Sequence, residues 1–310
     1  VVAAISVGSS QVDDLWSVLL NPGSNEIVWQ IRFPRVMAAV IVGAALGIAG
    51  LMAQGACNNA IAEPAILGTA AGASFGAVAG IATGLVQVGS LAALAFGTAG
   101  ALLATSITFK LAALRGALSS FNLIIVGIAV SAIFTSLVGI TSAVLNRADA
   151  RSISFWSLGS LALVTNENLL GLIITTLAGG VIAWFIAPML DRLSLGDQSA
   201  FHLGVNVPRV RLFALISLSL LAGGAVSTVG VIAFIGLAAP HIARFIYGPS
   251  HRALTIHSAI IGAFIVLVAD TLARTIAQPN ELPIGLATAL IGAPVLIALV
   301  SVKNNVWRTQ

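Results

Sequence analysis

Of the 310 residues in this chain, 58% are hydrophobic and only 8% are charged, and the formal net charge is +4. A soluble domain carries about 25% charged residues, so this composition excludes a soluble enzyme, a nucleic-acid binder and a disordered linker protein. The apolar residues form continuous runs and do not alternate, which also excludes an outer-membrane barrel. We therefore expect an all-α polytopic membrane protein, with residues 1–310 forming a single transmembrane domain in the lipid bilayer.

Nine apolar runs are long enough to cross a membrane, because a spanning helix needs about 20 residues. In chain order they are Phe33–Ala53, Ala62–Ala82, Ser90–Lys110, Phe121–Leu145, Asn168–Ala187, Pro208–Ser227, Val229–Tyr247, Thr255–Ala277 and Pro283–Val302. The apolar stub Val1–Val7 is predicted to be the end of a tenth helix whose beginning precedes this sequence, with a frayed terminus as the alternative. Between the stub and the first run, Ser10 and Asp13 open a short segment that we predict to be an interfacial helix anchored by Trp16.

The charges in the loops predict the orientation of these spans. One side of the membrane receives nine basic and three acidic residues, and the other receives five basic and seven acidic residues. The side with nine basic residues is predicted to be the cytoplasm. Its three acidic residues are Glu63, Asp191 and Asp197.

A faint internal repeat divides the chain. The tripeptide Pro-Arg-Val occurs at 34–36 and again at 208–210, and a proline follows each about 30 residues later, at Pro64 and Pro240. By the span count the first tripeptide lies outside and the second inside. The pattern therefore favours an inverted repeat, which is typical of transporters.

The centres of the predicted spans contain almost no ionisable residues. Only Asp270 and Arg274, one turn apart near the outer end of their helix, approach the interior, and an intrahelical ion pair is the alternative to a functional role. The sequence contains no metal-ligand spacing and no phosphate-binding loop. We therefore expect no metal site, no catalytic residue and no cofactor in this chain, so any energy for transport must come from a partner.

Glycines recur at fourth positions in two of the predicted spans. They are Gly43 and Gly47 in the first span, and Gly68, Gly72, Gly76, Gly80 and Gly84 in and after the second. This spacing lets helix backbones approach closely, so tight packing is the favoured interpretation, with a path-lining role as the alternative.

Five short signatures, taken in order, resemble one family. They are IRFPRVMAAVIVGAALGIAGLMAQ, NNAIAEPAILGTAAGASFGA, FWSLGSL, GVIAFIGLAAPHIARF and ADTLARTIAQPNELPIGLATALIGAPVLI. The chain resembles, over essentially its whole length, the FecCD-type permease subunits of type II ABC importers for iron–siderophore complexes, haem and cobalamin.

The resemblance implies an assembly as well as a fold. It implies ten transmembrane helices, a homodimer with the substrate path at the subunit interface, and a location in the cytoplasmic membrane of a prokaryote. The further partners it implies are two ATPase subunits, which bind ATP and magnesium, and an extracytoplasmic substrate-binding protein. The expected function is import by alternating access. A secondary carrier or channel without an ATPase, or a membrane scaffold, are the alternatives.

The resemblance also assigns roles to residues at both ends of the spans. Arg32, Arg35 and Arg274 match the arginines on which the binding protein docks, and anchoring to lipid headgroups is their alternative role. In the cytoplasmic stretch 191–210, the residues implied to contact the ATPase are Leu193, Leu195, Phe201, Leu203, Gly204 and Val205. An amphipathic segment resting on the bilayer is the alternative for this stretch.

The cytoplasmic gate is implied to comprise two short loops. Their residues are Asn58, Asn59, Ser119 and Ser120. The sequence departs from the family pattern here, because Ala60 stands where the family usually has proline. Without that proline the loop backbone is less restrained.

Overall fold

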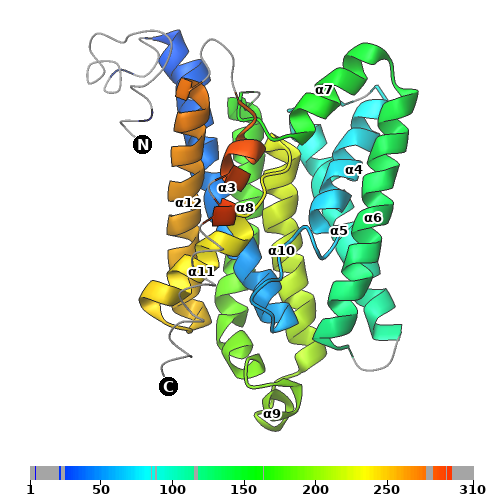
Figure 1. The fold of residues 1–310 in the computed structure, drawn as a ribbon, viewed down its shortest axis with the longest axis vertical. Helices are drawn as coiled ribbons and strands as arrows, with labels where there is room; N and C mark the ends of the chain where they lie inside the picture. The colour runs from blue at the N-terminus through cyan, green and yellow to red at the C-terminus, as the bar shows by residue number, and fades with distance from the viewer. Residues whose placement is uncertain are drawn as a thin grey trace.

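The computed structural model describes residues 4, 21, 25–84, 86–87, 89–114, 118–162, 164–276, 282–290 and 292–294. The regular structure of these residues is helical. The elements are η1 (Ile27–Arg32), α3 (Phe33–Cys57), α4 (Thr69–Ala82), α5 (Leu91–Leu114), α6 (Ser120–Val144), α7 (Arg147–Ser157), α8 (Asn166–Leu193), α9 (Asp197–His202), α10 (Val207–Val229), α11 (Ile235–Tyr247) and α12 (His251–Ile276). The long helices lie side by side, with α7 at one end of the bundle and α9 at the opposite end (Figure 1).

Six helices are long and apolar enough to cross a membrane, counted over the described residues: Ile27–Cys57, Leu91–Leu114, Ser120–Val144, Asn166–Leu193, Val207–Val229 and His251–Ile276. Each coincides with one of the nine predicted spans, so those six predictions are confirmed. For the ninth predicted span, the structure contains a shorter apolar helix over Ile284–Pro294. The expected helix end at Val1–Val7 and the interfacial segment around Trp16 lie outside the described residues, apart from Ala4.

The predictions for residues 62–82 and 229–247 were wrong in their first residues. Helix α4 begins only at Thr69 and α11 only at Ile235, and the backbone before each is irregular. The residue before α4 is Gly68, whose φ of 88° is accessible to glycine at little cost, and Pro64 disfavours helix in the residue that precedes it. Hydropathy is the same for helical and irregular segments, so the apolar runs alone did not reveal these breaks.

The glycines pack helices against one another, as the spacing predicted. A Cβ atom built on Gly72 would lie 2.5 Å from the carbonyl oxygen of Gly100 on α5, and one built on Gly43 would lie 2.3 Å from the carbonyl oxygen of Gly262 on α12. Any larger residue would push these backbones apart. The tight-packing interpretation is confirmed for both helix pairs.

The prolines of the proposed repeat occupy unequal positions. Pro34 and Pro208 are each the second residue of a long helix, where a missing N–H costs nothing. Pro64, however, lies in an irregular loop, whereas Pro240 lies inside α11. The first pair is therefore locally equivalent and the second is not, and the inverted repeat stays a prediction.

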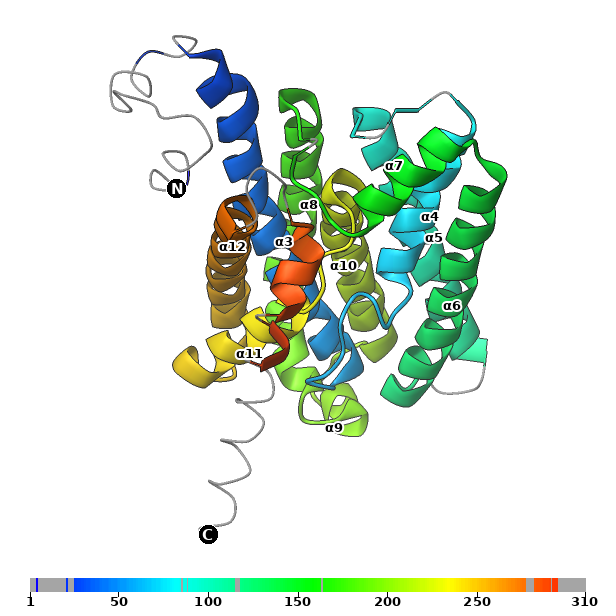
Figure 2. The same cartoon turned by 45° about the horizontal axis from the view of Figure 1, so that its top comes forward.

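Large apolar side chains cover much of the outside of the bundle. Helix α6 lies at the edge of the bundle (Figure 2), and Phe121 and Ile140 on it are exposed, as are Phe185 on α8 and Phe264 on α12. In water such a surface would aggregate, whereas in a bilayer it faces lipid tails as apolar as itself. The described part of the chain is therefore built for the membrane on its outer surface.

Candidate functional site

The sequence-predicted site residues gather at opposite ends of the bundle. The start of α3 and the end of α12, which carry Arg35 and Arg274, lie together at one end (Figure 1). The end of α3, the start of α6 and α9 lie toward the other. Helix α3 has 25 residues, which at 1.5 Å per residue corresponds to about 37 Å, so the two groups are separated by the thickness of a membrane.

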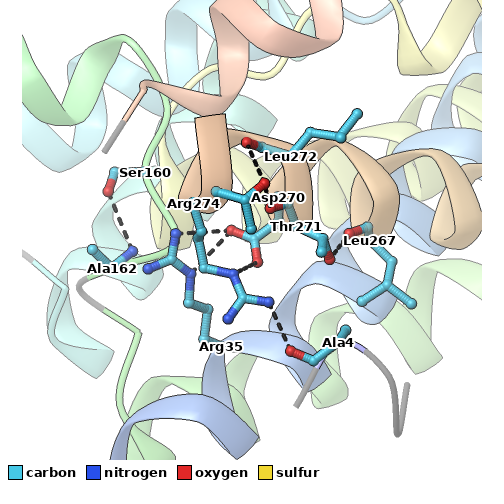
Figure 3. Close-up of polar contacts among 10 residues, drawn as sticks. Ala4, Arg35, Ser160, Ala162, Leu267, Asp270, Thr271, Leu272 and Arg274 are labelled. Carbon is cyan, nitrogen blue, oxygen red and sulfur yellow. Dashed lines mark hydrogen bonds and ion pairs between the residues drawn. The ribbon is translucent and has the colours of Figure 1, made fainter. Parts of the chain in front are cut away.

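At the first end, Asp270 binds two arginines. Its Oδ1 lies 2.9 Å from Nη2 of Arg35 and accepts a hydrogen bond from Nε of Arg35 at 3.0 Å, while its Oδ2 lies 3.2 Å from Nε of Arg274 (Figure 3). The predicted intrahelical pair of Asp270 and Arg274 is therefore present, and Arg35 of α3 completes it. All three side chains are buried.

This arginine cluster ties separate parts of the chain together. Nη2 of Arg274 donates a hydrogen bond to the carbonyl oxygen of Ala4 at 2.8 Å, so the cluster joins α3, α12 and the N-terminal segment. Arg32, at the end of η1, is buried as well. None of the three arginines lies on the open surface, and their docking role stays a prediction. Two guanidinium groups thus share the carboxylate of Asp270 at this end.

At the opposite end, the stretch 191–210 contains the short helix α9 between α8 and α10. Leu195, Phe201 and Leu203 are exposed, with 71% of Phe201 accessible. By contrast, Leu193 and Val205 are buried in the core of the chain itself. Of the residues predicted to contact the ATPase, Leu193 and Val205 therefore hold the stretch in place, whereas Leu195, Phe201 and Leu203 are accessible.

Gly204 ends the turn that follows α9. Its φ is 78°, and a Cβ atom built on it would have no neighbour within 4 Å. A side chain would therefore fit at this position, but the left-handed backbone conformation favours glycine. The side chain of Asn206 then accepts a hydrogen bond from the backbone N–H of Arg209 at 3.2 Å and caps α10.

The two predicted gate loops are short, capped connections. Asn58 ends α3 in the left-handed region, and Oδ1 of Asn59 accepts a hydrogen bond from the backbone N–H of Ile61 at 3.0 Å. Ser119 caps α6 by accepting from the backbone N–H of Asn122 at 3.2 Å. The Asn59 turn restrains the backbone beside Ala60, where the family usually has proline.

Both irregular segments line a small cavity inside the bundle. Glu63 and Pro64 of the first segment and Ile232 of the second surround it, together with Leu46 from the middle of α3. Glu63 was assigned to the cytoplasmic side by the loop count, and in the structure it is half-buried and lines the same cavity as Leu46 of α3. Irregular backbone within a membrane is tolerated where it is buried in protein or lines a cavity.

Sequence reasoning also passed over Arg211 on α10. It was counted only as one of nine cytoplasmic basic residues, yet its side chain is fully buried. The one feature of the sequence that could have drawn attention to Arg211 is its position among apolar residues near the start of α10. An arginine that is buried in such surroundings requires hydrogen-bonding or charged partners.

Long apolar helices, irregular segments around an internal cavity and exposed apolar side chains on and beside a short helix at one end are typical of a multi-pass membrane permease. The sequence model of the FecCD transport family matches residues 1–302, and the chain belongs to this family. It is thus the permease subunit of a bacterial ABC importer of the siderophore, haem and vitamin B12 group and is not itself an enzyme. In such importers ATP is bound by a partner ATPase and the substrate is supplied by a binding protein.

Individual relatives and a solved structure agree with this assignment. The chain is 38% identical to the ferric enterobactin permease FepD of Escherichia coli, with 81% of this chain and 75% of FepD covered. It is 36% identical both to the iron(3+)-hydroxamate permease FhuB of Bacillus subtilis, covering 84% and 69%, and to the hemin permease HmuU of Yersinia pestis, covering 84% and 80%. A metal-chelate type ABC transporter in an inward-facing conformation matches with a TM-score of 0.83 at 29% identity, covering 97% of this chain and 94% of that one. A secondary carrier, a channel and a scaffold are therefore no longer candidates.

Proposed function

We propose that two copies of this chain form a path for a bulky chelate, an iron–siderophore, haem or cobalamin, and move it by alternating access at the interface between them. Two ATPase subunits would engage the stretch around α9, and a binding protein would dock at the opposite end. The observation that carries this proposal is the exposed apolar set Leu195, Phe201 and Leu203, which lies at the end of the bundle opposite the arginine cluster.

The size of the internal cavity supports a path between subunits. The cavity beside Glu63 has a volume of about 50 Å³. Sites for small molecules and cofactors usually measure about 300–1,000 Å³. A chelate of this class is too large for this internal cavity, so we place its path at the interface of two chains.

The class of substrate follows from the relatives. Permeases named for ferric enterobactin, iron(3+)-hydroxamate, hemin and vitamin B12 are all 33–38% identical to this chain. Sequence identity is similar for permeases of all four substrates. We therefore propose only the substrate class for this chain, and we propose that the binding protein selects the individual substrate.

For docking, we propose that Arg32, Arg35 and Arg274 attract acidic residues of the binding protein. The gathering of guanidinium groups at the end of the bundle opposite α9 supports this role, because complementary charge sets the orientation and rate of association. The burial of these side chains speaks against the alternative of lipid anchoring, since an anchoring arginine extends its guanidinium toward the headgroups. Arg32→Glu should reduce stimulation of the ATPase by the binding protein, and unchanged stimulation would contradict the assignment.

For the gate, we propose that Asn58 and Asn59 on one side and Ser119 and Ser120 on the other close the cytoplasmic end of the path. Support comes from a cavity of about 310 Å³ beside Asn58 and Asn59, lined also by His241 and Arg244. Polar groups at this opening would let water and substrate leave toward the cytoplasm.

The decisive experiment removes one exposed aromatic ring. Phe201→Ala should weaken binding of the ATPase about 30-fold, measured as co-purification, because truncating a central aromatic anchor typically costs about 2 kcal/mol or more at an interface. Phe185→Ala is the matched control, since Phe185 is 72% exposed and Phe201 is 71% exposed, but Phe185 lies on the membrane-facing surface of α8. Equal retention of the ATPase by both variants would refute the proposed contact.

A further inference from the structure

The guanidinium group of Arg211 lies at the junction of three segments near the cytoplasmic end. Arg211 is on α10, directly after the stretch 191–210 that contains α9, and none of its surface is exposed. A buried charge is costly unless its hydrogen-bonding groups are satisfied. The partners of this arginine therefore indicate what its position is built to hold.

Every N–H of the guanidinium has an acceptor. Nε donates to the carbonyl oxygen of Ala56 at 2.9 Å, Nη1 donates to the carbonyl oxygen of Leu118, and Nη2 donates to Oγ of Ser120 at 3.1 Å. The carboxylate of Asp197 accepts two parallel bonds of 2.9 Å, one from Nη1 and one from Nη2. Arginine has five such donors, and here all five are used.

These acceptors belong to the segments that the proposed function assigns to gating and coupling. Ala56 lies in the last turn of α3, two residues before Asn58. Leu118 and Ser120 flank the cap of α6 at Ser119. Asp197 is the first residue of α9. One side chain thus connects α9 to both gate loops.

Asp197 differs from the other partners in charge and exposure. It supplies the negative charge that balances Arg211, and its side chain is 46% exposed, whereas Arg211 is sealed from solvent. A protein bound to the exposed face of α9 would therefore displace the carboxylate directly. Because the two parallel bonds fix the plane of the guanidinium, such a displacement turns or pulls the whole group.

We infer that Arg211 is a positioning residue that transmits displacement of α9 to both cytoplasmic gate loops. This inference rests on the proposed function, because it takes α9 to be the contact for the ATPase. When the ATPase moves Asp197, the guanidinium follows its counter-charge, since separation would leave an uncompensated buried charge. The bonds to Ala56, Leu118 and Ser120 then carry the movement to the end of α3 and the start of α6.

The variants that test transmission through Arg211 change only Asp197 or Arg211, apart from one control. Asp197→Asn keeps the size of the side chain but replaces one acceptor oxygen with a donor, which breaks one of the two parallel bonds. Asp197→Glu keeps the carboxylate and should rescue the function. Ser199→Ala is the control, because Ser199 is an exposed residue of the same short helix. Arg211→Lys keeps the charge with fewer donors and serves as a second disruption of the pair.

The readout is the accessibility of a cysteine in the gate loop. Ala60→Cys places a thiol at an exposed position, and the native Cys57 is fully buried, so a membrane-impermeant maleimide reports on residue 60. The complex of permease and ATPase in proteoliposomes is labelled without nucleotide and with ATP plus vanadate. The ratio of the two labelling rates measures how far the gate responds to the ATPase.

We expect a large ratio for the parent complex and for Ser199→Ala. Asp197→Asn should reduce the ratio about tenfold, the factor that loss of one charge-assisted hydrogen bond carries, and Asp197→Glu should restore most of it. An unchanged ratio in both Asp197→Asn and Arg211→Lys would overturn the inference, even if their thermal stability fell. Loss of ATPase binding by Asp197→Asn together with an unchanged ratio in Arg211→Lys would confine Asp197 to the subunit contact and also overturn it. A parent complex without any nucleotide response would refute the proposed function itself.

Discussion

Alanine at Gly50 should force α3 away from α11. Gly50 lies where α3 crosses the first residues of α11, and Nε2 of Gln54, one turn further along α3, donates to the carbonyl oxygen of Gly236 at 3.3 Å. A Cβ atom on residue 50 would lie 1.9 Å from that same carbonyl oxygen. Ordinary contact begins at 3.4 Å, so the two backbones would have to separate by about 1.5 Å.

The cost of this separation can be set against the gain in helix propensity. Overpacking a well-packed core typically costs about 1–3 kcal/mol, and we take about 3 kcal/mol because the obstructing atoms are backbone. Alanine is favoured over glycine in a helix by about 1 kcal/mol. The net loss of stability is therefore about 2 kcal/mol. At roughly 2 °C per kcal/mol for a chain of this size, Tm should fall by about 4 °C.

Thermal unfolding in one detergent, followed for both variants under the same conditions, tests this estimate. The control is Gly139→Ala on α6, where a Cβ atom would have no neighbour within 4 Å, so that only the gain in propensity remains. We expect Gly139→Ala to match or exceed the parent and Gly50→Ala to fall below it. If Gly50→Ala were as stable as Gly139→Ala, the close approach of α3 and α11 would be refuted.

Two further predictions concern the two ends of the bundle. Asp270→Ala should lower stability by about 3–5 kcal/mol, because it removes the buried carboxylate that pairs with Arg35 and Arg274. Glu167→Ala, an exposed carboxylate, is the control in the same thermal assay, and equal midpoints would contradict the prediction. Gly204→Val should lower substrate transported per ATP hydrolysed, because a β-branched residue is strained by about 1–2 kcal/mol at a φ of 78°. Gly204→Asn, which tolerates that conformation, should retain transport, and equal transport by both variants would show that the turn is not needed.

The sequence predicted the long helices well because their signal is local. A run of about 20 apolar residues is read directly from composition, and the six long helices all appear where such runs occur. The starts of α4 and α11 were not predicted, since they depend on backbone geometry at Gly68 and Phe234. The glycine contacts could be predicted as close packing, but the partner helix of each glycine could not.

The polar networks were harder to predict because their partners are distant in sequence. Arg35 and Asp270 are separated by 235 positions, so the sequence revealed only the local pair of Asp270 and Arg274. Whether a side chain can contact a partner also depends on its burial, which residue type alone does not reveal. Leu193 and Leu195 have the same side chain and lie two positions apart, yet Leu193 is in the core and Leu195 is exposed.

Helix α3 is held by a buried guanidinium group at each of its ends. Arg35, in its first turn, binds Asp270 of α12, and the carbonyl oxygen of Ala56, in its last turn, accepts a hydrogen bond from Arg211 of α10. The two anchors differ in what they can respond to. At the Arg35 end Asp270 is sealed from solvent, whereas at the Arg211 end Asp197 reaches it. A partner bound beside α9 can therefore act on the Arg211 anchor by touching Asp197. At the Arg35 anchor a partner has no direct access to the carboxylate that holds the guanidinium group.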